Sequence, residues 1–231
     1  MDTTSFYKPG QSVYVAWHIW NIAADAAKRA TDIKTTYPKA CTTDTVNAII
    51  IAATATEAFI NELSHLLSNL ESTDKSSQQT CHSDLKSIGQ LLEKQEEAHI
   101  QVNAKYLLAS ILLPRDALDT GKQLYQDFSM LIDMRNDFAH PKVNKKPPKY
   151  FESFVNKGWT YNAKTDEAKL VGWMFQLETP EVARWACRAA HNIIWNIIER
   201  FGGSSENEIQ SLYYTLQFQW GKTRNDERVM L

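Results

Sequence analysis

Cysteine, glycine and proline are all scarce in this sequence, and each scarcity excludes a class of protein. The three cysteines, Cys41, Cys81 and Cys187, are scattered and form no CxxC pair. This pattern argues against a disulfide framework or a structural zinc site, and it fits a reducing cytosol. Eight glycines and seven prolines in 231 residues are too few for a turn-rich β fold, so they favour helices.

The chain also has no long continuous apolar run and no strong excess of charge. Its most apolar stretch, 46–55, has about ten residues, whereas a membrane-spanning helix needs ~20. The first five residues have neither the basic nor the apolar region of a signal peptide. We therefore expect a cytoplasmic protein without membrane contact. A net charge of −2 gives no overall attraction to nucleic acid, so any such contact requires a local basic patch.

Apolar residues recur at helical spacing through most of the chain. This periodicity predicts helices at 11–37, 45–70, 84–113 (with a break), 119–139, 180–201 and 206–220. The segment 151–177 lacks such a pattern and is typical of a short hairpin or an irregular loop. We therefore predict a single all-α domain over 1–231, a bundle of about six to seven helices. It has an N-terminal extension at 1–10, a basic loop and insert at 141–178, and a frayed tail at 221–231.

The most informative segment ends the helix predicted at 119–139. Arg135-Asn136-Asp137-Phe138-Ala139-His140 carries an arginine, an asparagine and a histidine within six positions, and Pro141 follows. Asn136 and His140 are four residues apart and share a helix face, whereas Arg135 lies about 140° around the helix from His140. One helix therefore does not easily bring Arg135 and His140 onto the same atom, but two copies packed at their helix ends could. The spacing points to a composite site across a dimer.

These residue types suit phosphate chemistry. The negative end of the helix macrodipole favours protonated His140 by roughly 0.3–1 kcal/mol, which suits a general acid or a phosphate ligand. Arg135 offers a planar fork of donors for a phosphate, and Asn136 can orient the imidazole or a substrate hydroxyl. A basic loop without acids follows the motif and would attract a polyanion such as RNA. Its RNA-binding candidates are Lys142, Lys145, Lys146 and Lys149.

The segment from Arg135 to His140 resembles the RxxxxH signature of the HEPN superfamily, including the asparagine that commonly follows the arginine. The resemblance implies a metal-independent endoribonuclease that acts as a homodimer, in which the ribose 2′-hydroxyl attacks the adjacent phosphate. Arg135 would bind the phosphate, His140 would act as acid or base, and Asn136 would support both. The resemblance extends to a toxin or defence effector with an antitoxin or regulatory partner. Some HEPN toxins carry a modified tyrosine two residues after the histidine; here that position is Lys142, a departure from the pattern.

Three other interpretations stay open at this stage. In one, Arg135 pairs with an acid and His140 caps its helix, so the motif is only structural. In another, the domain is a non-catalytic HEPN-like module that binds RNA, a nucleotide or a protein. In the third, Glu-x-x-His pairs form a di-metal site, although such pairs are common on solvated helix faces and we expect no metal or cofactor. The residues of that third interpretation are Glu62 with His65, Glu96 with His99, and Glu57, Glu181 or Glu199.

Overall fold

The computed structural model describes residues 15–36, 43–69, 79–113, 116–141, 146–161, 172–202, 207–221 and 228. Within these residues every regular element is a helix, which confirms the predicted all-α class. The expected extension at 1–10 and most of the tail at 221–231 lie outside the described residues. The elements are α1 (Val15–Thr36), α2 (Thr43–Ser68), α3 (Gln79–Glu97), α4 (Val102–Leu112), α5 (Gln123–Ala139), α6 (Lys149–Asn156), α8 (Trp173–Gln176), α9 (Pro180–Ile198), the 3-10 helix η2 (Glu199–Phe201) and α10 (Asn207–Gly221).

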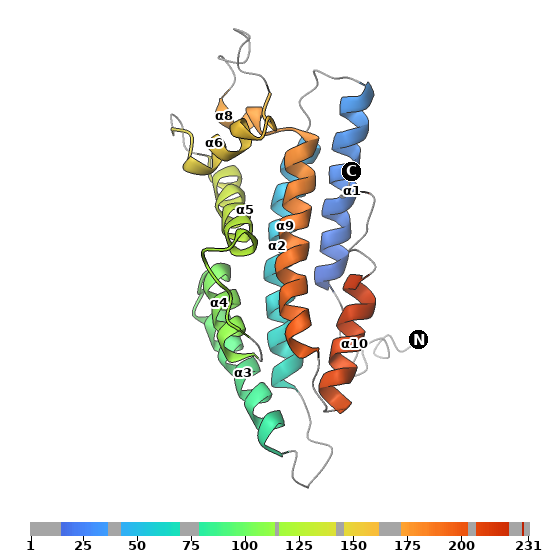
Figure 1. Cartoon of the computed structure of the whole chain (residues 1–231), viewed down its shortest axis with the longest axis vertical. Coiled ribbons are helices and arrows are strands. Elements are labelled where there is room, and N and C mark those ends of the chain that lie inside the picture. Colours follow the sequence, from blue (N-terminus) through green and yellow to red (C-terminus); the bar gives the residue numbers. More distant parts are fainter. Residues whose placement is uncertain are drawn as a thin grey trace, which may run out of the picture.

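Helix α2 is the centre of the bundle. It packs against α1, α3, α4, α5 and α9, and Figure 1 shows α9 beside it, with α1 on one side and the α3–α5 segment on the other. Small side chains allow helix axes to approach closely, and α1 and α2 bury many of them. The fully buried alanines are Ala16, Ala23, Ala24, Ala26, Ala27 and Ala30 on α1, and Ala48, Ala52, Ala53 and Ala55 on α2.

The same helix α2 is, in the described part of the chain, the one helix that is long and apolar enough to cross a membrane. Half of its most apolar window is buried inside the protein, and the core helix of a bundle passes the same test. The length and hydropathy of α2 were not recognised from the sequence, because only continuous apolar runs were considered there. The hydropathy of α2 comes instead from alanines and aliphatic residues interspersed with threonines.

The predicted break within 84–113 is present, and it separates α3 from α4. His99 has φ of 54°, in the left-handed region that non-glycine residues rarely adopt, and it lies between the end of α3 at Glu97 and the start of α4 at Val102. The chain turns there, so that α3 and α4 both contact α2. Because of this break, the segment forms two helices, α3 and α4, rather than one continuous helix.

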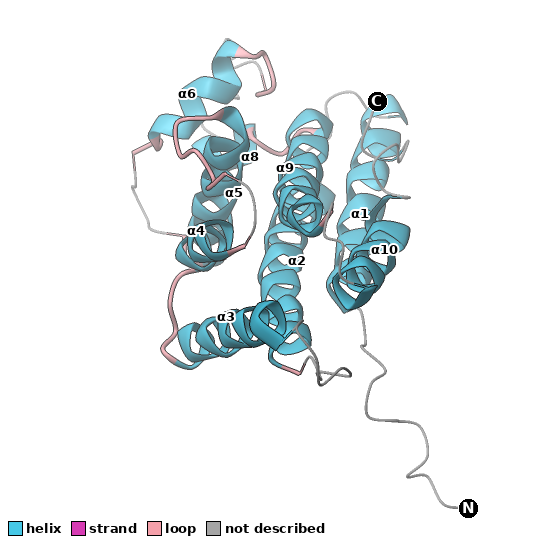
Figure 2. Ribbon diagram, turned by 60° about the horizontal axis from the view of Figure 1, so that its bottom comes forward, coloured by secondary structure: helices cyan, strands magenta, loops and turns pink. Residues whose placement is uncertain are grey.

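The hairpin considered for the insert is wrong where the structure describes it. Residues 149–156 form α6 and residues 173–176 form the short α8, while 162–171 lie outside the described residues. Aromatic side chains of α6 and α8 pack together, and those of α6 also pack on α9. Tyr150 and Phe151 each pack edge-on against Trp173, and Phe154 is fully buried against Trp185. Figure 2 shows α6 and α8 beside one end of α5.

Helices α2 and α3 cross closely at Gly89. A Cβ atom there would lie 2.3 Å from the backbone nitrogen of Ser68 and 2.7 Å from the carbonyl carbon of Leu67. Both contacts are backbone, so the helices must move apart to admit a methyl group. This close crossing explains why a glycine stands inside α3, where it costs about 0.5–1 kcal/mol relative to alanine.

Gly89→Ala is therefore expected to destabilise the fold by about 1–3 kcal/mol, because the overpacking outweighs the gain in helix propensity. Urea unfolding followed by circular dichroism measures the change. Gly172→Ala is the matched control, since a Cβ there meets nothing closer than 3.9 Å. A Gly89→Ala variant as stable as the wild type would contradict the close crossing.

Candidate functional site

The motif residues lie on the last two turns of α5, which packs against α2 and α9. Phe128, Leu131 and Met134 are fully buried and anchor the helix in the core. The helix ends as predicted: His140 has φ of −130° and ψ of 63°, and its N–H donates to the Asn136 carbonyl at 3.0 Å. The backbone around His140 is thus fixed by a rigid helix, while its side chain is exposed.

Arg135 points toward the neighbouring helix α2. Its Nη2 lies 3.2 Å from Oε2 of Glu57, and the arginine side chain is only 27% exposed. Its Nε is buried and donates to no acceptor within the part of the chain that the structure describes. This ion pair corresponds to the structural interpretation of Arg135, in which an acid on a neighbouring helix holds the guanidinium.

Asn136 and His140 are exposed, unlike Arg135. Among the described residues, no hydrogen bond or ion pair joins Arg135 to either of them. This divergence is what the 140° separation around α5 requires. One chain therefore presents the histidine to solvent and directs the arginine against α2.

A buried lysine lies near the ion pair of Arg135 with Glu57, and it was not predicted from the sequence. Lys105 on α4 is 3% exposed; its Nζ donates to Oδ1 of Asn61 at 3.2 Å and forms an ion pair with Glu96. Burial lowers the pKa of Lys105, and the nearby carboxylate of Glu57 opposes that shift. The one sequence signal for this lysine is its position as the single charged residue in the apolar segment 102–112.

The basic loop is only partly described. Lys146 and Lys149 are exposed and follow the end of α5, whereas Lys142 and Lys145 lie outside the described residues. Helix α6 is held to the motif by Tyr150, whose hydroxyl donates to Oδ2 of Asp137 at 2.7 Å. Burial, followed by this hydrogen bond, raises the pKa of Tyr150, which therefore remains a donor.

A groove runs along α5 and ends against α6. We call it the α5–α6 groove and define it by Tyr125, Asp133, Asn136, Asp137 and Tyr150, which are among its lining residues. Arg135 and His140 do not line it. Asn136 is thus the motif residue that borders both the groove and the exposed helix end.

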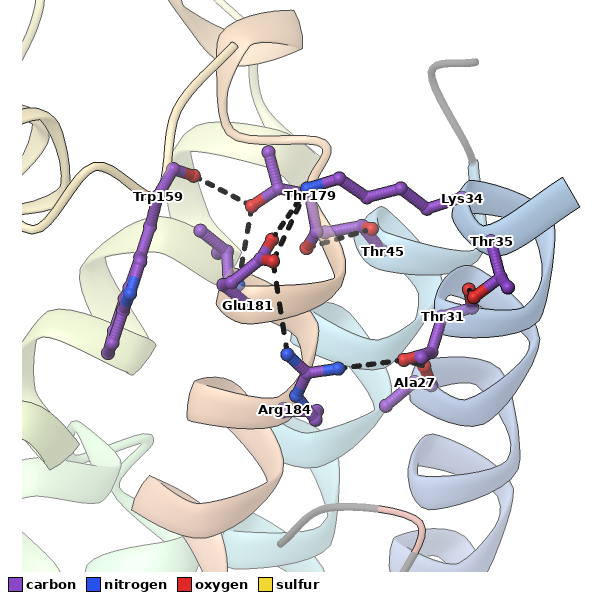
Figure 3. Close-up of polar contacts among 10 residues, drawn as sticks. Ala27, Thr31, Lys34, Thr35, Thr45, Trp159, Thr179, Glu181 and Arg184 are labelled. Atoms are coloured by element: carbon purple, nitrogen blue, oxygen red, sulfur yellow. Dashed lines mark hydrogen bonds and ion pairs between the residues drawn. The ribbon is translucent and has the colours of Figure 1, made fainter. Parts of the chain in front are cut away.

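The insert is fastened to the bundle at the start of α9, as the Thr179-Pro180-Glu181 sequence suggests. The Thr179 hydroxyl caps the helix by accepting from the N–H of Val182 at 3.4 Å, and it donates to the Trp159 carbonyl at 2.7 Å. Glu181 pairs with Lys34 of α1 at 3.1 Å (Figure 3). The hydrogen bond to Trp159 joins the segment after α6 to the start of α9, and the ion pair of Glu181 with Lys34 joins the start of α9 to α1.

The carboxylates considered as metal ligands have other partners. Glu57 pairs with Arg135 and Glu96 with Lys105, while Glu62 accepts from the N–H of Ala16 at 3.0 Å. Across the described ranges, no three His, Cys, Asp or Glu side chains lie together as a metal ion would require. The di-metal interpretation has no such cluster among these residues to support it.

The chain matches no known family model, and neither the curated proteins nor the solved structures contain a match to it. The fold and the site define an all-α helical bundle in which a helix ending in an exposed histidine carries an arginine held by a neighbouring glutamate. The resemblance to the HEPN superfamily therefore depends on residues 135–140 and on the helical fold.

Proposed function

We propose that this protein is a metal-independent endoribonuclease of HEPN type. The observation that supports this most is the presence on one helix of an exposed His140, at the C-terminal end of α5, and of Arg135 five residues earlier. Exposed Lys146 and Lys149 lie in the segment that follows and supply positive charge for an RNA backbone. In the attack of a neighbouring hydroxyl on a phosphate, an arginine can stabilise the developing charge and a histidine can transfer a proton.

The proposed reaction needs no metal or cofactor. The ribose 2′-oxygen attacks the adjacent phosphorus as its proton passes to a base, and the bond to the 5′-oxygen of the next nucleotide breaks as that oxygen takes a proton from an acid. The products are a 2′,3′-cyclic phosphate and a 5′-hydroxyl. His140 supplies the acid or the base, Arg135 stabilises charge on the phosphate, and Asn136 orients the imidazole or the 2′-hydroxyl.

Two protomers complete the proposed site. Arg135 and His140 of one chain lie on different faces of α5, so we infer a homodimer in which the ends of two α5 helices meet and each of two symmetry-related pockets takes Arg135 from one chain and His140 from the other. Pairing with Glu57 keeps the guanidinium oriented before substrate binds. By resemblance, the activity would belong to a toxin or defence effector controlled by a protein antitoxin.

The direct test is cleavage of a mixed RNA by the purified protein in EDTA. Cleavage is expected to continue at the same rate with and without the chelator and to leave cyclic phosphate ends, which chromatography of the products identifies. A control preparation carrying Arg29→Ala, a surface arginine paired with Asp44, should cleave equally well. RNA that stays intact with a folded protein at high concentration would overturn the nuclease proposal.

The second candidate is a non-catalytic HEPN-like module that binds RNA, a nucleotide or a protein partner. The ion pair between Arg135 and Glu57 favours it, because a paired guanidinium binds a phosphate less readily. Intact RNA together with a stable folded dimer would support this candidate.

A further inference from the structure

We propose that Lys105 is a positioning residue of the site around Arg135, where it controls how readily Glu57 releases the guanidinium to an RNA phosphate. The proposal rests on the proposed function, because it takes Arg135 as the phosphate ligand. Lys105 is 3% exposed, so a substrate does not reach its amine. Any effect of Lys105 on RNA must therefore pass through the charged groups beside it.

Glu57 of α2 interacts with two cations that come from different helices. Its Oε2 accepts from Nη2 of Arg135 on α5 at 3.2 Å. Burial lowers the pKa of Lys105 on α4, and the carboxylate of Glu57 is close enough to oppose that shift. Asn61 lies four residues after Glu57, on the same face of α2, and accepts from Nζ of Lys105 at 3.2 Å. One face of α2 thus holds both cations.

The contact between Arg135 and Glu57 is suited to exchange. A guanidinium can bind a carboxylate through two parallel hydrogen bonds, but one bond, from Nη2, is found between these two residues. Nε of Arg135 is buried and donates to no acceptor among the described residues. The two side chains are 27% and 43% exposed, and ion pairs that reach solvent in this way are weak. A phosphate, which accepts two bonds from a guanidinium, can therefore compete with Glu57 for Arg135.

The buried lysine makes this exchange easier. When a phosphate takes Arg135, the carboxylate of Glu57 loses its ion pair, and a partly buried charge without a counter-charge is unfavourable. Lys105 compensates, because its positive charge stays near Glu57 whether or not Arg135 is bound there. The lysine is itself held by Asn61 and by the ion pair with Glu96 on α3. Without Lys105, Glu57 would hold Arg135 more strongly and would compete better with RNA.

The test measures the affinity of the full chain for a fluorescein-labelled single-stranded 2′-O-methyl RNA of about 16 nucleotides, which has no 2′-hydroxyl and is not cleaved. Fluorescence anisotropy is expected to show that Lys105→Met, which keeps the apolar stem and removes the charge, weakens binding by about three- to five-fold. Glu57→Gln should tighten binding by a similar factor. In a Glu57→Gln background, Lys105→Met should change the affinity by less than about two-fold, because the carboxylate through which Lys105 acts is gone.

A matched control removes the same charge elsewhere. Lys28→Met changes an exposed lysine of α1 and should have the same effect, less than about two-fold, with and without Glu57. Circular dichroism checks that Lys105→Met folds. If it does not, Glu96→Gln takes its place, since this change leaves Lys105 to interact more strongly with Glu57. Binding should then tighten by about two- to three-fold, and only while Glu57 is present.

Two outcomes would overturn the role of Lys105 alone. Equal weakening by Lys105→Met with and without Glu57 would mean general electrostatic attraction. Weaker binding by Glu57→Gln would mean that Glu57 assists Arg135 instead of competing with RNA. Wild-type protein that binds no RNA, or Arg135→Ala protein that binds as tightly as the wild type, would instead overturn the function on which the proposal rests. Because binding is measured, none of these results depends on the rate of cleavage.

Discussion

His140→Ala is expected to reduce the rate of RNA cleavage by about 1,000-fold, because it removes the proposed proton-transfer group. The fold should be unaffected: the side chain is exposed, and the helix-ending hydrogen bond is made by the backbone N–H. Exposed positions usually change stability by no more than about 0.5 kcal/mol. Initial rates on a quenched fluorescent RNA measure the loss. His18→Ala, which changes an exposed histidine of α1, should keep full activity.

The composite site predicts that two inactive variants rescue each other. Arg135→Ala should also abolish cleavage, at a cost in stability of up to about 1 kcal/mol from the lost ion pair with Glu57. A mixture of Arg135→Ala and His140→Ala that has exchanged subunits contains mixed dimers. One of their two pockets keeps both the guanidinium and the imidazole, so about a quarter of wild-type activity should return.

If the rescue fails, the activity of the wild type shows whether the dimer arrangement or the catalytic proposal is wrong. If wild-type protein cleaves RNA but the mixture does not, the two groups act within one chain and the twofold arrangement is wrong. If the wild type does not cleave either, the catalytic proposal itself fails. Size-exclusion chromatography with light scattering confirms that the mixture forms dimers.

Trp20→Ala is expected to cost about 3–5 kcal/mol of unfolding free energy. Trp20 is fully buried in α1, where its indole N–H donates to the Cys187 carbonyl of α9 at 3.1 Å. Its ring lies against Trp220 of α10, with ring centroids 6.2 Å apart, and against His191, at 5.8 Å. Truncation would therefore leave a large cavity, remove the hydrogen bond to the Cys187 carbonyl and weaken the contact to α10.

Thermal unfolding measures this change, and the midpoint should fall by about 10 °C for a chain of this length. Near-ultraviolet circular dichroism should also lose intensity as the tryptophan cluster loosens. Tyr214→Ala is the matched control, since that aromatic side chain on α10 is 60% exposed and should shift the midpoint by less than about 2 °C. An unchanged midpoint for Trp20→Ala would contradict the packing of α1 on α9 and α10.

Elements governed by neighbouring residues could be predicted from the sequence. The helix end at His140 follows from Pro141, and the start of α9 follows from Thr179 and Pro180; both are present. The divergence of Arg135 and His140 follows from helix geometry and is also present. In contrast, the helix start expected near Asp119 lies at Gln123, because the Asp119 side chain accepts from the N–H of Gly121 and holds a turn.

Elements governed by distant residues could not be predicted in this way. The segment 151–177 was expected to be a short hairpin or an irregular loop, because its helices α6 and α8 depend on the packing of Tyr150 and Phe151 against Trp173. The burial of Lys105 was not predicted, because the partners of its amine, Asn61 and Glu96, are distant in the sequence or lie on another helix. Likewise, Glu57 and Arg135 are 78 residues apart, and nothing local links them.

By itself, the sequence determined that this protein is helical, where most of its helices begin and end, and that an arginine and a histidine leave α5 in different directions. Those properties depend on hydrogen bonds and steric limits within a few residues of each position. Only the tertiary structure decided that Glu57 holds Arg135, that Lys105 is buried, and that a groove beside Asn136 ends against α6. Such contacts depend on which helices pack together, and that choice minimises the free energy of the whole chain rather than of any one segment.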